Sequence, residues 1–144
     1  DTSCCRPYKE MAVTNNTEHL RYPDTYQSLN KLATYISIWR EAKGFETNWN
    51  NVPEKLMLIV SELAEAMEEY RYISASSLNV LDGKIPLELN DEDSERVRAF
   101  GVEIADTFIR LFDLAGSLSI DLDRVVSEKA TINQSRPFRH EKER

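Results

Sequence analysis

Apolar residues along this chain recur at helical spacing in several segments. The most regular segment covers residues 100–118, where apolar side chains occupy almost the whole circumference of a helix. Its one charged wedge contains Glu103, Asp106, Arg110 and Asp113. A helix that is apolar on nearly every side is expected to be buried. The carboxylates of this wedge therefore form either its only solvated strip or the lining of a site.

Two segments before this stretch also predict helices. The first helix is expected to begin near residue 23 and to end at Gly44. The second is expected to run from Pro53 to Tyr72, because proline is well tolerated in the first turn. Its expected core seam consists of six residues: Leu56, Ile59, Val60, Leu63, Met67 and Tyr70. Three glutamates of the second helix lie on the roughly opposite side: Glu62, Glu65 and Glu69.

The remaining residues predict one long loop and one further helix. Residues 73–92 have no helical rhythm, so we expect a long loop there, of the kind that is usually functional or mobile. The helix around residues 100–118 is expected to begin near Asp93 or Ser94. Asp121 is expected to cap a fourth helix that ends at Pro137. The inward face of that helix is expected to contain Leu122, Val125, Val126 and Ala130. Together the four helices predict an all-α, four-helix bundle-like fold.

Length and charge place limits on the domain organisation and on the partners. Residues 1–22 and 141–144 are polar and aperiodic, so we expect flexible tails around one all-α domain at residues 23–140. The net charge is −7, from 25 acidic and 18 basic residues. This balance argues against non-specific binding to a nucleic acid polymer, which requires a basic surface. It suits a protein that recruits cations before it holds an anionic ligand.

Cysteine use and hydropathy bear on the compartment. Cys4 and Cys5 are adjacent, which provides neither a disulfide framework nor metal-ligand spacing. The longest apolar run in the body of the chain is residues 56–60, far too short to span a membrane. A cytoplasmic protein without a membrane partner is therefore expected.

Two pairs of carboxylates have the spacing of a metal site. Glu62 and Glu65 are three residues apart on the second helix, and Glu103 and Asp106 are three apart on the third, so each pair shares one helix face. If the two helices are antiparallel, four carboxylates converge across a groove and require a cation, and their hard oxygen ligands favour Mg²⁺, Mn²⁺ or Ca²⁺. In isolation, Glu62 and Glu65 are more typical of a solvated helix surface. For Glu103 and Asp106 the solvated strip and the metal site are nearly balanced, because their helix has so little polar surface.

A di-iron bundle is the main competing metal site. It needs Glu-x-x-His pairs on the facing helices. The two histidines, His19 and His140, lie outside these helices, and this excludes a di-iron site of that type.

A basic stripe follows near the end of the chain. Lys129, Asn133 and Arg136 are spaced i, i+4 and i+7, on one side of the fourth helix. Basic residues in this position often do no more than complement the helix dipole. The same three side chains could hold phosphate oxygens on the far side of a metal, and charge alone does not separate the two roles.

The order of these motifs resembles a known family. Glu62-x-x-Glu65 is followed by Glu103-x-x-Asp106 within GVEIADTFIRLFDLAG, and then by the basic stripe and Pro137-Phe138-Arg139-His140. This order is similar to that of the MazG-like all-α nucleoside triphosphate pyrophosphohydrolases, over residues 29–140. Each acidic pair alone is weak support, whereas the two pairs and the basic stripe in this order are fairly specific.

The resemblance implies an enzyme that removes surplus or damaged nucleotides from the nucleotide pool. Its expected reaction is hydrolysis of a nucleoside or deoxynucleoside triphosphate to the monophosphate and pyrophosphate. Glu62, Glu65, Glu103 and Asp106 would bind Mg²⁺, with Mn²⁺ as an alternative, and Glu62 and Glu65 would also take part in catalysis. Water would then attack the α-phosphorus.

The resemblance also implies where the substrate lies and how the chain assembles. The phosphates would contact Lys129, Asn133 and Arg136. The base would be held near the first helix and the start of the second by residues such as Trp39, Phe45, Trp49 and Asn51. Trp39 has the spacing of an ordinary core residue as well. Members of the family form homodimers or homotetramers, so the same is expected here.

One departure from the family pattern leaves the general base open. Many members carry a second glutamate directly before the first ligand, and this chain has Ser61 there. Glu65, Glu69 or a hydroxide generated by the metal would then serve as the base. Ser61 also keeps open a second hypothesis, namely a catalytically inactive acidic helical interaction module with the same fold.

Overall fold

The computed structural model describes residues 28–84 and 88–136. This part of the chain contains five helices and no strand, which confirms the all-α prediction. The helices are α1 Leu29–Ala42, α2 Val52–Tyr72, α3 Ala75–Leu81, α4 Asp91–Ser117 and α5 Leu122–Gln134. The predicted tails, the first turn expected before residue 28 and the Pro137-Phe138-Arg139-His140 segment lie outside the described residues.

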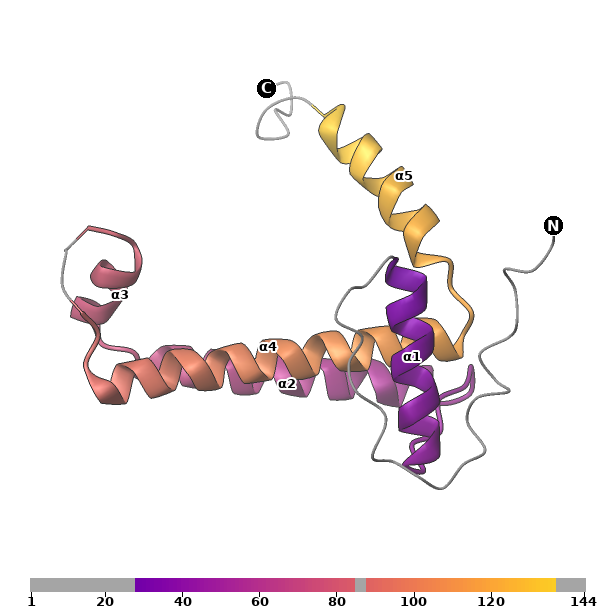
Figure 1. Cartoon of the computed structure of the whole chain (residues 1–144), viewed down its shortest axis with the longest axis horizontal. Helices are drawn as coiled ribbons and strands as arrows, with labels where there is room; N and C mark the ends of the chain where they lie inside the picture. The colour runs from indigo at the N-terminus through magenta and orange to yellow at the C-terminus, as the bar shows by residue number, and fades with distance from the viewer. Residues whose placement is uncertain (1–27, 85–87, 137–144) are drawn as a thin grey trace.

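The two longest helices form an antiparallel pair (Figure 1). α2 and α4 lie side by side, and α1 crosses one end of the pair against α4. α3 lies at the opposite end, and α5 leaves the α1 end and points away from the pair. No helix within the described ranges is both long enough and apolar enough to cross a membrane.

Polar side chains cap several helix starts. Ser28 accepts a hydrogen bond from the backbone of Lys31, and Asn90 accepts one from the backbone of Asp93. Asp121 accepts one from the backbone N–H of Arg124, which confirms the cap predicted for this aspartate. Each cap satisfies a backbone donor that the first turn of a helix leaves free, so these boundaries are set locally.

The prediction of a loop over residues 73–92 was wrong in part. Residues Ala75–Leu81 form α3, and α4 begins at Asp91, two or three residues earlier than expected. α3 has only seven residues, and a helix of two turns is too short to display a helical repeat of apolar positions. Its start is determined by Ser74, whose side chain accepts a hydrogen bond from the backbone of Ser77.

Asp93 joins α3 to the first turn of α4. Its buried carboxylate accepts hydrogen bonds from the Ser77 hydroxyl at 2.5 Å, the Ser74 hydroxyl at 2.7 Å and the Asn90 amide at 2.9 Å. The bonds from Ser77 and Ser74 hold the pKa of Asp93 at about 2, below its ordinary value of 3.8. Because these donors favour the charged form, the ionised carboxylate stabilises this end of the molecule.

Replacement of Asp93 by Asn is expected to destabilise the protein in a pH-dependent way. The folded state binds the Asp93 proton more weakly than the unfolded chain, so the stabilisation is complete above about pH 4 and is lost as the pH falls toward 2. The difference in urea midpoint between wild type and Asp93→Asn should therefore be largest at neutral pH and shrink below pH 4. Asp82→Asn, which alters an exposed pair with Lys84, is the control and should show no such trend. An equal difference at pH 7 and pH 2.5 would contradict the assignment.

α1 and α4 approach each other most closely at Gly116. A Cβ atom at this position would collide with the backbone carbonyl of Ala33 on α1. Ala33 is almost fully buried, so α1 has little room to move aside. The absence of a side chain at Gly116 therefore allows α1 to pack directly on the backbone of α4.

Replacement of Gly116 by Ala is expected to lower the free energy of unfolding by about 1–3 kcal/mol, because the added methyl group forces the two helices apart. Gly101→Ala on the same helix is the matched control. A Cβ at Gly101 meets nothing within 4 Å, so this substitution should stabilise the protein by about 0.5–1 kcal/mol through helix propensity. Chemical denaturation followed by far-UV circular dichroism measures both values. Equal effects of the two substitutions would rule out the close contact.

The face of α2 that packs on α4 differs from the predicted seam. Its buried residues within the helix are Ile59, Glu62 and Ala66. The remaining residues of the predicted seam, Leu56, Val60, Leu63, Met67 and Tyr70, are 46–51% exposed. On α5, Val125, Val126 and Ala130 are likewise exposed rather than inward-facing. A sequence pattern identifies an apolar face but does not tell which partner covers it.

Candidate functional site

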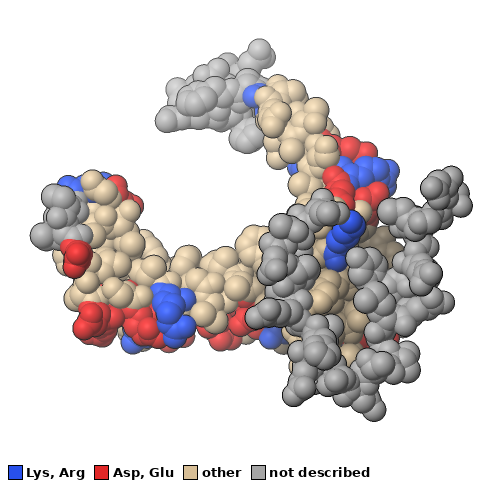
Figure 2. Space-filling view, viewed as in Figure 1, with Lys and Arg blue, Asp and Glu red and all other residues tan. Residues whose placement is uncertain are grey.

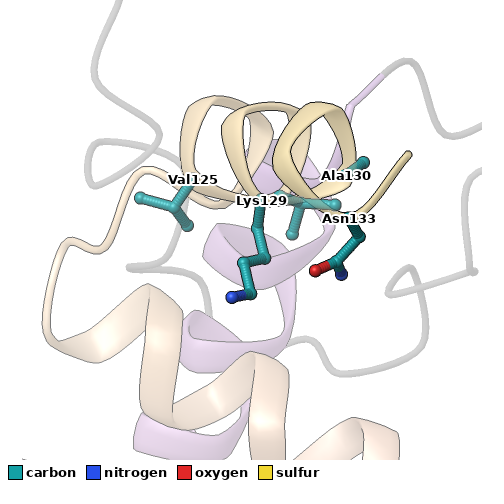
Figure 3. Close-up of a pocket in the computed structure, with 5 residues that line it drawn as sticks. Val125, Lys129, Ala130 and Asn133 are labelled. Carbon is teal, nitrogen blue, oxygen red and sulfur yellow. The ribbon is translucent and has the colours of Figure 1, made fainter. Parts of the chain in front are cut away.

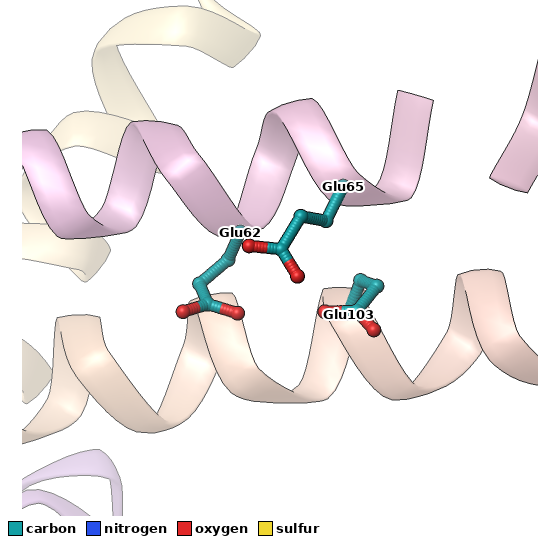
Figure 4. A group of neighbouring side chains, drawn as sticks. All are labelled: Glu62, Glu65 and Glu103. Atoms are coloured by element: carbon teal, nitrogen blue, oxygen red, sulfur yellow. The ribbon is translucent and has the colours of Figure 1, made fainter. Parts of the chain in front are cut away.

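Three glutamates converge between α2 and α4. Glu62 and Glu65 of α2 and Glu103 of α4 each offer a carboxylate oxygen, and these oxygens all lie within 4.8 Å of one another (Figure 4). Glu62 is buried, Glu103 is half-buried and Glu65 is exposed. The antiparallel arrangement of the two helices brings the two predicted acidic segments together. We refer to Glu62, Glu65 and Glu103 as the carboxylate triad.

The triad has the donor set and dimensions of a divalent-cation site. Two oxygens on opposite sides of an ion that binds at about 2.1 Å are about 4.2 Å apart, and adjacent ones are closer. The separations in the triad fall near this range. Carboxylate oxygens are hard ligands, which suit Mg²⁺ and Mn²⁺. The residues present therefore fit such an ion with small side-chain adjustments.

The electrostatics of the triad also favour a cation. Burial raises the pKa of Glu103, and the charges of Glu65, Glu62 and Asp106 raise it further. A metal-free site therefore holds a proton on Glu103 more readily than an ordinary glutamate does. A cation would offset the repulsion that causes this shift. Asp106, the fourth predicted ligand, is outside the triad but close enough to affect Glu103.

Arg110 pairs with the most buried member of the triad. Its Nε and Nη2 atoms lie 2.6 Å and 2.5 Å from Oε1 of Glu62. The side chain of Glu62 is 9% exposed, and that of Arg110 is 28% exposed. The sequence alone does not assign a role to Arg110. Its position seven residues after Glu103, on the same helix face, was the signal that could have placed it beside the triad.

Asp113, the last residue of the charged wedge, has a different partner. Its carboxylate accepts hydrogen bonds from Arg40 Nε on α1 and from the Thr47 hydroxyl, both at 2.9 Å. Asp113 and Arg40 are both buried. Three of the four wedge residues therefore face other helices: Glu103 and Arg110 face α2, whereas Asp113 faces α1. It is not a solvated strip.

The predicted base-binding residues lie around the connection between α1 and α2. Phe45 and Trp49 are 50% and 70% exposed, and the Arg40 guanidinium lies 4.5 Å from the centre of the Phe45 ring. Asn51 accepts a hydrogen bond from the backbone N–H of Asn48 and donates one to the carbonyl of Glu46. These two bonds stabilise the conformation of the connection.

Trp39 of α1 is more enclosed than the other aromatic candidates. Its side chain is half-buried, and its indole N–H is buried without an acceptor among the described residues. The exposed faces of Phe45 and Trp49 are therefore the more accessible stacking surfaces for a base.

The predicted basic stripe is exposed on α5. Lys129 and Asn133 extend from one face of this helix and, with Val125, Val126 and Ala130, line an open hollow (Figure 3). Arg136 is exposed beyond them. Because α5 points away from the α2–α4 pair, the structure does not bring this stripe to the triad within one chain (Figure 1).

The start of α5 is attached firmly to the start of α1. The Asp123 carboxylate accepts hydrogen bonds from the backbone N–H groups of Leu29 and Asn30, at 2.8 Å and 3.4 Å. In return, the Asn30 side chain accepts a bond from the backbone of Asp123 and donates one to Asp121. Each helix thus caps the first turn of the other, and we call this arrangement the reciprocal cap.

Charge is unevenly distributed over the visible face of the molecule (Figure 2). The edge of the α2–α4 pair that faces the space between α3 and α5 is mostly uncharged, whereas acidic and basic side chains gather along the opposite edge.

No protein-family model, curated protein or solved structure matches this chain.

Proposed function

We propose that this chain is a Mg²⁺-dependent pyrophosphohydrolase that converts a nucleoside or deoxynucleoside triphosphate to the monophosphate and pyrophosphate. The observation that carries the proposal is the carboxylate triad, in which two helices supply three oxygens within 4.8 Å. The order of acidic and basic motifs, similar to that of MazG-like enzymes, supports the choice of substrate. The exposed aromatic rings near α1 suit a nucleotide base.

In this proposal the triad holds the cation, with Asp106 beside it. When bound, Mg²⁺ would neutralise phosphate charge and make the α-phosphorus easier to attack. Glu62 and Glu103, the less exposed members, fix the position of the site between the helices. Trp49 and Phe45 would hold the base, and this would orient the triphosphate relative to the triad.

Glu65 is the residue best placed to accept the proton of the attacking water. Glu69, the alternative on the same helix, is engaged by Arg96 at 2.9 Å. Among the described residues Glu65 accepts a single long hydrogen bond, from the Ser61 hydroxyl at 3.5 Å. The water oxygen would bond to the α-phosphorus, and one of the water protons would pass to Glu65. The bond between the α-phosphorus and the oxygen that bridges it to the β-phosphorus would break, which would release pyrophosphate.

The direct test is product analysis with a panel of canonical and modified nucleoside triphosphates in the presence of Mg²⁺. Equimolar monophosphate and pyrophosphate are expected, and chelation of the metal should abolish both. Release of single phosphates would contradict the proposed bond cleavage. The absence of product from every nucleotide would overturn the enzymatic proposal and favour the interaction-module hypothesis.

The proposal includes self-association of the chain. Leu56, Val60, Leu63, Met67 and Tyr70 are exposed at alternating spacings of four and three residues, which is the repeat of a helix–helix seam. Phe100 and Ile104 of α4 flank the same apolar surface next to Leu63. A seam of this kind on a long helix is self-complementary around a two-fold axis, so a second copy of the chain is the proposed occupant. The basic stripe would then reach a triad only from a neighbouring copy or after α5 reorients.

Replacement of Leu63 by Glu is expected to lower the solution mass measured by light scattering, because it places a charge in the middle of the seam. Val126→Glu on α5 is the control, since Val126 is 48% exposed and lies outside the seam. Wild type and Val126→Glu should share one mass, a multiple of the chain mass of 16.7 kDa. A monomeric wild-type protein at micromolar concentration would refute the assembly.

A further inference from the structure

Glu62 forms an ion pair with a cationic side chain of the same chain, Arg110. Both Nε and Nη2 of Arg110 converge on a single oxygen of Glu62, Oε1. The Glu62 carboxylate has two oxygens that point in opposite directions along the helices, and one of them points toward Glu65 and Glu103 (Figure 4). The same carboxylate therefore serves both an arginine and the triad.

Arg110 neutralises the negative charge of Glu62 at a position where solvent screens that charge poorly. The Glu62 side chain is only 9% exposed, and an ionised carboxylate at such a depth requires a partner. Glu65 and Glu103 add further negative charge within 4.8 Å. A divalent ion in the triad would supply that compensation in place of Arg110, and its own positive charge would repel the guanidinium.

The guanidinium is partly accessible to solvent. Its side chain is 28% exposed, three times more than that of Glu62, so Arg110 reaches the site from the solvent side. The planar fork of arginine fits phosphate oxygens as well as it fits carboxylate oxygens. A triphosphate bound through a cation at the triad would place such oxygens beside Arg110.

We propose that Arg110 is an exchangeable counter-ion: it pairs with Glu62 when the metal is absent and transfers to a phosphate of the nucleotide when the cation binds Glu62. This inference rests on the proposed function. It makes Arg110 a competitor of the metal in the free protein and a ligand of the substrate in the complex. The free protein would thus bind metal weakly, and metal and nucleotide would favour each other's binding.

The exchange predicts that one variant binds the metal more tightly and the nucleotide more weakly. Arg110→Gln removes the competitor, so Mn²⁺ alone should bind about tenfold more tightly, as monitored by electron paramagnetic resonance. The same variant should bind a non-hydrolysable triphosphate about tenfold more weakly in saturating Mn²⁺. The probe is the α,β-imido analogue of the nucleotide that gives the most pyrophosphate.

Arg96→Gln is the matched control. Arg96 lies seven residues before Glu103, as Arg110 lies seven residues after it, and it pairs with Glu69 of α2 at 2.9 Å. This variant loses the same charge from the same helix without loss of a contact to the triad. Its affinities for Mn²⁺ and for the analogue should stay within about twofold of the wild-type values.

Three results would overturn the exchange. Weaker Mn²⁺ binding by Arg110→Gln would mean that Arg110 only positions Glu62, and unchanged Mn²⁺ binding would mean that the two do not compete. Unchanged affinity for the analogue would exclude the transfer to phosphate. If the Gln variant does not fold, Arg110→Lys keeps the charge without the fork and should change both affinities in the same directions by a smaller factor. A wild-type protein that neither binds Mn²⁺ nor releases pyrophosphate would instead refute the proposed function itself.

Discussion

Replacement of Glu103 by Gln is expected to reduce pyrophosphate release by about 10²- to 10⁴-fold while the fold is retained. The loss follows because Glu103 is the contribution of α4 to the carboxylate triad, and a metal that stabilises phosphate charge supplies several kcal/mol to the reaction. Activity should be measured at saturating Mg²⁺, together with Mn²⁺ affinity, which is expected to fall. Glu95→Gln is the control, because Glu95 is an exposed glutamate on the same helix that pairs with Arg98. A fully active Glu103→Gln protein would show that the site lies elsewhere.

The same variant should be more stable than the wild type when metal is absent. Burial and the neighbouring carboxylates raise the pKa of Glu103 above its ordinary value of 4.5. Ionisation at neutral pH therefore costs the folded state more than the unfolded chain, and a neutral glutamine avoids this cost. The urea midpoint in the presence of a chelator should be higher for Glu103→Gln at pH 7. The gain should disappear below about pH 4.5, where the wild-type carboxyl is protonated in both states.

Replacement of Asp113 by Ala is expected to lower the free energy of unfolding by about 3–5 kcal/mol, because it leaves the buried charge of Arg40 without its partner. A loss of this size is a large part of the stability of a typical domain. It should also loosen the connection that carries Trp49, since Thr47 is held by the same carboxylate. Urea denaturation measures the first effect, and the fluorescence of the tryptophans reports the second.

Two control variants test whether the effect of Asp113→Ala arises because the Arg40–Asp113 ion pair is buried. Removal of both partners in Arg40→Met/Asp113→Leu should cost less than Asp113→Ala alone, because no charge is left stranded. Arg98→Ala breaks the pair with Glu95, in which both side chains are more than 60% exposed, and should change stability by less than about 1 kcal/mol. If Asp113→Ala and Arg98→Ala had similar effects, the Arg40–Asp113 pair would not be a structural anchor.

Features set by local chemistry could be predicted from the sequence. The extent of α2 and the cap at Asp121 depend on residues within a turn or two of each other. The convergence of the two acidic segments followed from their spacing and from the antiparallel order of long helices. α3 was missed because a helix of seven residues leaves no periodic signal.

The partners of the charged wedge could not be predicted in the same way. Arg110 and Glu62 are 48 residues apart in sequence, and Asp113 and Arg40 are 73 apart. Side-chain spacing within one helix gives no information about the register of another helix against it. The exposed seam of α2 presents the same difficulty, since its apolar repeat is equally compatible with a partner helix from this chain or from a second copy.

The reciprocal cap makes α1 and α5 mechanically dependent on each other. α5 cannot turn about its first residues without a break in the hydrogen bonds that Leu29 and Asn30 of α1 donate to Asp123. The far end of α1 leads directly into the connection with Phe45 and Trp49, whereas the far end of α5 carries Lys129 and Asn133. A reorientation of α5 that brought its basic stripe to a triphosphate would therefore be transmitted through α1 to the aromatic residues proposed to hold the base. Recognition of the two ends of a nucleotide would then be a single coupled event rather than two independent ones.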